Sequence, residues 1–279
     1  MATLIFARLT FVEAIRRRIL LAAFVLGVAF LTLYGTGFFF MQEQWRSGAS
    51  GIMSEVIRKQ FYTFLVMAGL YAVNFLGAIM GAILSADTLA GEIASGTVQA
   101  LATKPVRRVE IVLGKWLGYA AMLEGYLLLM AGGVLGASRL VGSYTPPHAL
   151  LGLALMGFNV LLLLSVSFMG GAMLSTLANG VMVFGLYGVA FIGGWIEQFG
   201  AMMRNQSAVN IGILTSLILP SEAIWKRAAF EMQSPLVAAL GVSPFTSSSV
   251  PSPLMMGYAA LYLLAVLALA LRQFKQRDL

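Results

Sequence analysis

Residues 149–173 read ALLGLALMGFNVLLLLSVSFMGGAM, a run without a charged side chain or a proline. A run of 18 or more such residues is long enough to cross the hydrocarbon core of a bilayer as an α-helix. Five further stretches share this character: residues 19–41, 61–86, 116–138, 181–199 and 254–271. The six stretches together hold two charges, whereas the remaining 145 residues hold 27. The sequence therefore predicts an all-α, polytopic membrane protein with six transmembrane helices, forming a single transmembrane domain over residues 1–279.

The composition excludes most other classes of protein. The chain has 279 residues, of which 59% are hydrophobic and 10% charged, whereas soluble domains carry about 25% charged residues. Cysteine is absent and His148 is the one histidine, which excludes disulfides, thiolate metal sites and multi-histidine metal sites. We expect no metal site and no catalytic residue. The net charge of +7 fits the lysine and arginine bias of membrane proteins, so we expect no nucleic-acid partner.

Lysine and arginine set the predicted orientation. With a cytoplasmic N-terminus, the inside segments comprise 62 residues with 11 Lys or Arg: 1–18, 87–115, 174–180 and 272–279. The outside segments comprise 83 residues with 7 Lys or Arg: 42–60, 139–148 and 200–253. Because cytoplasmic segments are enriched in these residues, both termini are predicted to be cytoplasmic. The protein is expected in the cytoplasmic (inner) membrane, in contact with the lipid bilayer.

The segment before the first span is predicted to lie along the membrane surface. Residues 1–18 form an amphipathic helix that is apolar on one side and ends in three arginines, a pattern typical of interfacial helices. Thr10 and Glu13 have the spacing of a capping box, which places a helix start at Thr10.

The long outside segment, residues 200–253, is predicted to enter the membrane without crossing it. Its apolar run 208–219 is too short to span a bilayer, and Pro220 ends that run. Ser221 is a good N-cap for a following helix. We expect re-entrant or interfacial helices here, before the last span.

The longest predicted cytoplasmic loop, residues 87–115, has the residues needed to turn twice. Gly96 can take a positive φ at the end of a helix that continues from the second span. Thr97 is a competent N-cap, and Pro105 ends the helix that starts there. The short helix between them is marginal alone, so we expect it to dock into another surface through one face: Val98, Leu101 and Ala102.

Three groups of residues in this loop carry a family pattern: Gly91-Glu92-x-x-x-Gly96-Thr97, Lys104-Pro105-x-Arg107-Arg108 and Gly114-Lys115. The pattern resembles the first cytoplasmic loop of ABC-2-type ABC transporter permeases. The basic leader, six spans and outer loop extend the resemblance over nearly the whole chain. Residues 220–227 also resemble the subgroup that includes the permease for nitrous-oxide reductase maturation. Members of the family often carry a second acidic residue where this chain has Ala94.

The resemblance implies that the short helix is a coupling helix seated in a groove of a separate ATPase subunit. The residues assigned to coupling are Glu92, Gly96, Thr97, Val98, Leu101, Ala102, Pro105, Arg107 and Arg108. The implied assembly contains two ATPase subunits, which bind ATP and Mg, and a second permease copy, either identical or a close paralogue. This chain is then the transport subunit of an exporter, with no cofactor of its own. The competing interpretation is that Gly, Thr and Pro here serve only a tight loop.

The chain is not expected to hydrolyse ATP itself. Gly114-Lys115 is followed by Trp116, and Val109 stands where a P-loop needs its first glycine. Two other functions stay open from the residues. One is a subunit that transmits ATP-driven force to an extracytoplasmic partner without moving a solute. The other is an intramembrane enzyme, which is disfavoured because no span contains an Asp pair, a histidine or a cysteine.

A few polar residues lie within the predicted spans. Glu124 is near the middle of the third span, where a carboxyl costs roughly 3 kcal/mol, so we expect it to face the bundle or a wet cavity. Asn74 and Asn159 are its candidate partners. The three residues either line a substrate path or lock helix packing. Glu197, near the outer end of the fifth span, is expected to be interfacial.

Small residues predict where helices approach closely. The spacing that permits such contacts occurs in Gly77-x-x-x-Gly81 and Gly132-x-x-x-Gly136, and a Gly193-Gly194 pair lies in the fifth span.

Overall fold

The computed structural model describes residues 2–16, 18–47, 52–94, 107–233 and 249–276. Within these residues all regular secondary structure is helical: α1 (Ala2–Arg16), α2 (Arg18–Ser47), α3 (Ile52–Ala94), α5 (Arg108–Gly142), α6 (Ala149–Met173), α7 (Thr176–Met202), α8 (Gln206–Ile218), α9 (Ser221–Met232) and α11 (Pro253–Gln276). Six of these helices are long and apolar enough to cross a membrane: α2, α3, α5, α6, α7 and α11. The predicted fold class is confirmed.

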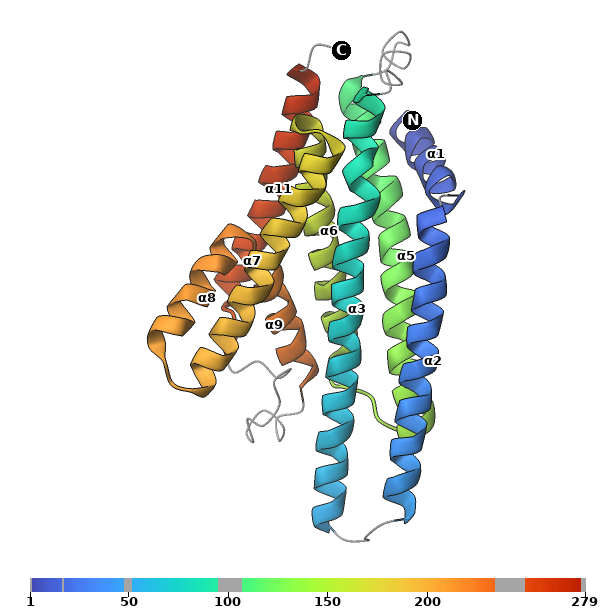
Figure 1. The fold of residues 1–279 in the computed structure, drawn as a ribbon, viewed down its shortest axis with the longest axis vertical. Coiled ribbons are helices and arrows are strands. Elements are labelled where there is room, and N and C mark those ends of the chain that lie inside the picture. The colour runs from blue at the N-terminus through green and yellow to red at the C-terminus, as the bar shows by residue number, and fades with distance from the viewer. Residues whose placement is uncertain (1, 17, 48–51, 95–106, 234–248, 277–279) are drawn as a thin grey trace.

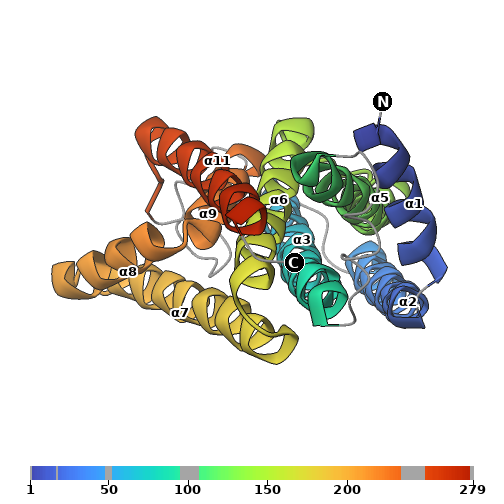
Figure 2. The same ribbon diagram turned by 90° about the horizontal axis from the view of Figure 1, so that it is seen from above.

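Helix α6, the uncharged helix of the opening stretch, lies at the centre of the molecule with α3 beside it (Figure 2). It contacts α3, α5, α7, α9 and α11, and residues 162–168 are all buried. Helix α2 lies at an edge, next to α3 and α5, and leaves most of its apolar surface exposed. A helix that is apolar all round is suited to a position between other helices, which explains the place of α6.

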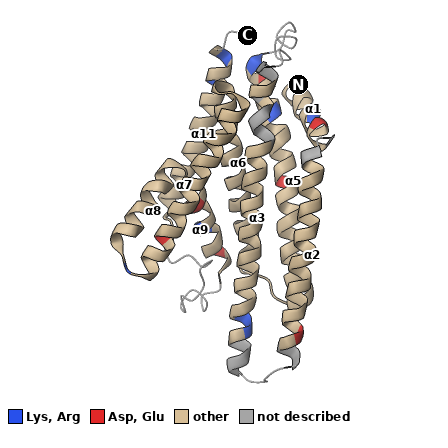
Figure 3. Ribbon diagram, in the orientation of Figure 1, with Lys and Arg blue, Asp and Glu red and all other residues tan. Residues whose placement is uncertain are grey.

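Both described ends of the chain lie at the same end of the bundle (Figure 1), as an even number of crossings requires. Charged residues lie near the ends of the long helices and around α8 and α9. Few occur along the middles of the long helices (Figure 3). This distribution follows from the cost of placing a charge in hydrocarbon.

The connections use residues suited to sharp turns. Between α5 and α6, Ser143 and His148 adopt positive φ values of 52° and 45°, and the Tyr144 hydroxyl lies 2.8 Å from that of Thr63 on α3. Between α7 and α8, Arg204 has a φ of 54° and the Asn205 side chain accepts hydrogen bonds from two backbone N–H groups of α8. Short polar side chains at such N-caps satisfy otherwise unpaired donors.

Helices α8 and α9 form the pair predicted before the last span. They meet at a bend of 110°, and α8 lies alongside the part of α7 that is farther from the chain ends (Figure 1). The predicted N-cap is wrong by one residue. Ser221 is the first residue of α9 and Pro220 precedes the helix as its cap, because the fixed φ of a proline suits a helix start and leaves no orphan N–H.

Helix α1 packs closely against α5 at two glycines of α5. A Cβ atom at Gly118 would lie 2.6 Å from the Ala7 carbonyl oxygen and 2.8 Å from Cβ of Thr10, and Gly114 faces Thr3, Phe6 and Ala7 at similar range. The backbones therefore touch where glycine leaves room. The capping box predicted at Thr10 is wrong, since α1 begins at Ala2 and Thr10 is buried within it.

Apart from Phe6, which faces Gly114, the large apolar side chains of α1 point away from the bundle and are exposed: Leu4, Ile5, Leu9, Phe11, Val12 and Ile15. An outward apolar face on a helix that also carries arginine is what an interfacial position requires.

The predicted glycine pairs behave differently from one another. Gly77 and Gly81 face Val160 and Leu164 of α6, whereas no described atom lies within 4 Å of a Cβ atom built at Gly132 or Gly136. The Gly-x-x-x-Gly spacing thus predicted a real helix contact at Gly77 and Gly81. At Gly132 and Gly136 the described residues make no such contact.

We predict that Gly118→Ala lowers the free energy of unfolding by about 1–3 kcal/mol, because the added methyl group overlaps the backbone of α1. The matched control is Gly125→Ala on the same helix, where no described atom lies within 4 Å. That change should be neutral or stabilise by about 0.5–1 kcal/mol, since alanine favours the helix. Thermal unfolding of the purified chain in detergent measures both, and equal effects would refute the close α1–α5 contact.

Candidate functional site

The connection between α3 and α5 contains most of the residues assigned to coupling. Six of them lie outside the described residues: Gly96, Thr97, Val98, Leu101, Ala102 and Pro105. Glu92 belongs to the last turns of α3, but its side chain is also outside the described part. The docking face therefore stays a prediction, and the structure describes its two flanks.

The α5 flank of this connection is fixed by backbone and side-chain contacts. The Arg107 N–H donates to the Glu110 carboxylate at 3.3 Å, and the Glu110 N–H donates to the Arg107 carbonyl at 2.9 Å. Arg108 Nη1 donates to the carbonyl oxygen of Lys275, in the last turn of α11, at 3.3 Å. Arg107 thus caps the start of α5, and Arg108 joins it to the end of the last span.

The two membrane asparagines are brought together. Asn159 Nδ2 on α6 donates to Asn74 Oδ1 on α3 at 3.1 Å, and both side chains are fully buried. A hydrogen bond between amides in a helix interface fixes which faces of the two helices are in contact. The asparagines are therefore partners of each other.

Glu124 lies apart from that pair as a partly buried carboxyl between α5 and α6. A Cβ atom at Gly157 of α6 would lie 2.5 Å from Glu124 Oε2, so the absence of a side chain there makes room for the carboxyl. Its Oε1 atom is buried without a hydrogen-bond partner among the described residues. A carboxyl in this state has polar capacity that helix packing does not use.

The strongest cluster of charges was missed by the sequence analysis. Glu197 of α7, expected at the interface, is only 4% exposed, and the Lys226 ammonium of α9 lies 2.7 Å from its Oε2 atom as an ion pair without a well-aligned hydrogen bond. Lys226 is 6% exposed. The expectation failed because α8 and α9 fold back over the end of α7 and cover Glu197.

Glu222 completes this cluster from the first turn of α9. It is 3% exposed, its side chain lies directly over Gly194 of α7, and its Oε1 atom has no hydrogen-bond partner among the described residues. The spacing of Glu222 and Lys226 is the i, i+4 spacing that places two side chains on one helix face. That spacing is the sequence signal that could have revealed part of the cluster.

Aromatic rings enclose the cluster from α3 and α7. Tyr71 of α3 lies 5.0 Å from Trp225, centroid to centroid, and its hydroxyl accepts a hydrogen bond from Trp195 Nε1 at 3.1 Å. The carboxyl of Glu222 interacts electrostatically with the phenols of Tyr71 and Tyr187. The cluster is thus bordered by aromatic rings on this side.

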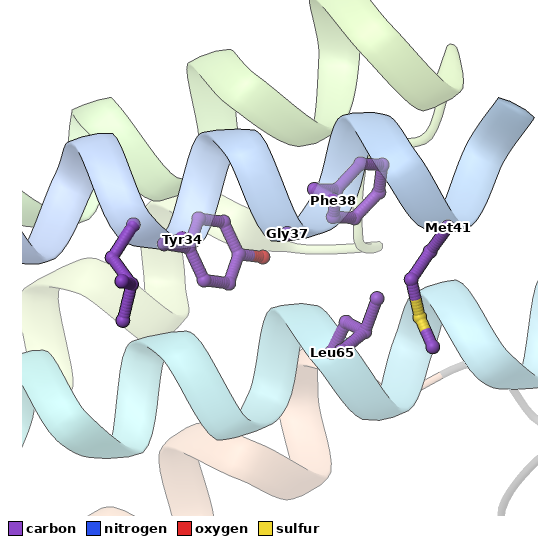
Figure 4. A pocket seen from close by; sticks show the side chains of 6 residues that line it. Tyr34, Gly37, Phe38, Met41 and Leu65 are labelled. Carbon is purple, nitrogen blue, oxygen red and sulfur yellow. The ribbon is translucent and has the colours of Figure 1, made fainter.

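Two cavities accompany these features. One, of about 220 Å³, lies between α2 and α3 and is lined by apolar groups and the Tyr34 ring (Figure 4). The other, of about 210 Å³, is lined by Glu197, Lys226 and Ser216 together with residues that lead into α11. The first offers apolar contact surface, and the second gives the buried ion pair a polar pocket on one side.

Within the described residues no group of three or more His, Cys, Asp or Glu side chains is placed to hold a metal ion. The structure brings together two groups of polar residues, the asparagine pair and the charged cluster of α7 and α9. Glu124 lies apart from both. None of these arrangements has a nucleophile beside a general base.

Comparison with known proteins gives one finding. A family model described as ABC-2 family transporter protein matches residues 4–279. No curated protein matches the chain.

We predict that Lys226→Met lowers the free energy of unfolding by about 3–5 kcal/mol, because it leaves the Glu197 carboxylate buried and unpaired. The neighbouring Arg227→Met is the matched control: Arg227 is more exposed and pairs with Glu231 on the same helix, so its loss should cost about 1 kcal/mol or less. Denaturant or thermal unfolding of the purified chain compares them. Similar losses for both variants would contradict the buried ion pair.

Proposed function

Since the chain belongs to the ABC-2 family of transporter proteins, we propose that it is the membrane-spanning permease subunit of an ATP-binding cassette exporter. It is a multi-pass membrane component without an ATPase site of its own. A separate ATPase subunit supplies ATP hydrolysis in this proposal, with ATP and Mg bound there. The role of this chain is to convert the closing of the two ATPase subunits into a conformational change of the membrane helices.

The lengths of α3 and α5 support this role. Helix α3 has 43 residues and spans about 65 Å at 1.5 Å per residue; α5 has 35 residues. The proposed coupling segment, residues 97–103, joins the ends of these two helices. Because α3 also packs against α6 and α7, a displacement applied to the segment reaches the centre of the bundle along a rigid helix.

The proposed assembly has two ATPase subunits and a second permease copy, either identical or a close paralogue. The exposed apolar side chains of α2 support a lipid or protein neighbour there, since Leu26, Leu33 and Phe40 are each about two-thirds or more exposed. The chain ends lie at one end of the bundle (Figure 1), which we assign to the cytoplasm from the lysine and arginine bias.

Location and direction of transport rest on the sequence. We propose the cytoplasmic (inner) membrane and export, and we assign the chain to the subgroup of the nitrous-oxide reductase maturation permease from residues 220–227. The structure adds that Trp225 and Lys226 of that stretch are buried, so this part of the resemblance concerns residues of the protein interior.

The polar residues of the spans divide between two roles. Asn74 and Asn159 hydrogen-bond each other, which supports a packing role. Glu124 makes no such pair, and unlike the asparagines, which also keep one unpartnered buried atom each among the described residues, it is ionisable, which supports a position on the substrate path. An ionisable group within a membrane is costly and is retained where it acts.

Val98→Asp and Leu101→Asp test the coupling assignment. A carboxylate in the docking face should abolish co-purification with the ATPase subunit or lower coupled ATP turnover at least tenfold, because an unpaired charge in an apolar groove is costly. The matched controls are Val98→Ile and Leu101→Met, which preserve apolar contact. Unchanged association and turnover in the Asp variants would refute the coupling helix.

The same complex distinguishes the alternative function. Reconstituted in vesicles, a complex that hydrolyses ATP and moves a solute supports the exporter. ATP turnover that depends on an extracytoplasmic partner, with no solute moved, would instead identify a subunit that transmits force.

Glu124→Gln tests the substrate-path assignment. The change should leave the free energy of unfolding within about 1 kcal/mol, because Gln keeps the shape and removes an uncompensated carboxyl, while ATP-driven transport falls at least tenfold. Asn159→Leu is the contrasting variant and should lower stability by about 1 kcal/mol, since Asn74 Oδ1 loses its donor. Full transport by Glu124→Gln would reassign Glu124 to helix packing.

A further inference from the structure

The buried cluster of α7 and α9 has more acidic groups than basic ones. Lys226 is paired with Glu197 at 2.7 Å, and Glu222 is the second carboxyl, 3% exposed. Glu222 Oε1 is buried without a hydrogen-bond partner among the described residues. If all three groups are ionised, the cluster carries a net charge of −1 inside the protein.

The depth of Glu222 makes that charge costly. Its side chain lies over Gly194 of α7, which is within the membrane-crossing segment Thr176–Met202. A carboxylate at this depth needs a partner or must lose its charge. The N-terminus of α9 favours an anion, but this effect is small beside the cost of burying an unpaired charge.

The helices packed against α9 supply no second cation near Glu222. Among the described residues, α6 and α8 carry no titratable side chain, and α3 and α7 present Tyr71, Tyr187 and Glu197. On α11, Tyr258 donates to the Leu217 carbonyl and Tyr262 is its neighbour, while Arg272 and Lys275 lie in the last turns, at the end of the bundle where the chain ends. Arg227 and Glu231 of α9 pair with each other.

We propose that Glu222 holds one proton in this fold and that Glu197, Glu222 and Lys226 form a proton-binding site in the membrane-embedded part of the protein. A proton neutralises the cluster through a single oxygen atom. A Ca²⁺ or Mg²⁺ ion takes six or more oxygen ligands and is repelled by the Lys226 ammonium. The described residues place no three His, Cys, Asp or Glu side chains together to hold a metal ion.

The second cavity gives this site a side that water can reach. Its lining includes Glu197, Lys226, Ser216 and Ser252, but not Glu222, and its volume of about 210 Å³ has room for several water molecules. Exchange of the proton therefore passes through the ion pair or follows a separation of α9 from α7, where the Glu222 side chain lies over Gly194. The second route ties proton release to movement of α9.

Infrared spectroscopy of the full-length chain in lipid tests the proposal. At neutral pH exposed carboxyls are ionised, because their pKa is about 4, so a protonated C=O stretch reports a buried acid. We expect such a band in the natural chain, its loss in Glu222→Gln and its retention in Glu231→Gln, which alters a partly exposed residue of the same helix. Glu124→Gln is recorded alongside, so that any contribution from Glu124 is assigned separately.

A second variant leaves Glu222 in place. Glu197→Gln frees Lys226 to neutralise Glu222, so the cluster no longer needs a proton and the Glu222 band should disappear. The proposal is overturned if the natural chain shows no protonated band, if Glu222→Gln retains the same band, or if the band persists in Glu197→Gln. A band that vanishes when sodium replaces choline at constant pH would also overturn it, because a metal ion would then compete for the site.

Discussion

The interior of a bilayer offers the backbone no hydrogen-bond partner, and the architecture of this protein follows from that constraint. Six long helices satisfy their own backbone groups and cross the membrane. The chain departs from a straight helix within the bundle at the 110° bend between α8 and α9, and Leu219 and Pro220 at that bend are buried in protein. Irregular backbone is tolerated there because neighbouring helices, and not lipid, surround it.

Polar side chains inside the membrane also need a partner within the protein, so they mark positions with a structural or functional role. Asn74 pairs with Asn159 across α3 and α6, and Asn179 donates to the Ser167 carbonyl at 2.9 Å. Lys226 pairs with Glu197. Asn74 Nδ2 and Asn159 Oδ1 are, like Oε1 of Glu124 and of Glu222, buried without a hydrogen-bond partner among the described residues, but only the two carboxyls can carry a charge. An acid that packing does not need is the best indicator of function inside a membrane.

Helices α1 and α5 approach each other closely. Gly114 and Gly118 admit α1 to the surface of α5, which turns the large apolar side chains of α1 outward. The leader is thereby attached next to Arg107 and Arg108, at the flank of the proposed coupling segment. The close contact fixes α1 to α5, the helix that follows the proposed coupling segment in the sequence.

The sequence by itself determined the six apolar spans and the helix pair before the last one, because charge, length and proline placement are local properties of the chain. The motif in residues 91–115 indicated the family. It also identified Asn74, Glu124 and Asn159 as unusual, since each interrupts an apolar run. Only the tertiary structure decided how these polar groups pair: Asn74 with Asn159, and Glu197 with Lys226. Partners separated by 29 residues or more meet when helices fold back on one another. Periodicity reports which face of a helix is apolar, but not which helix will cover it.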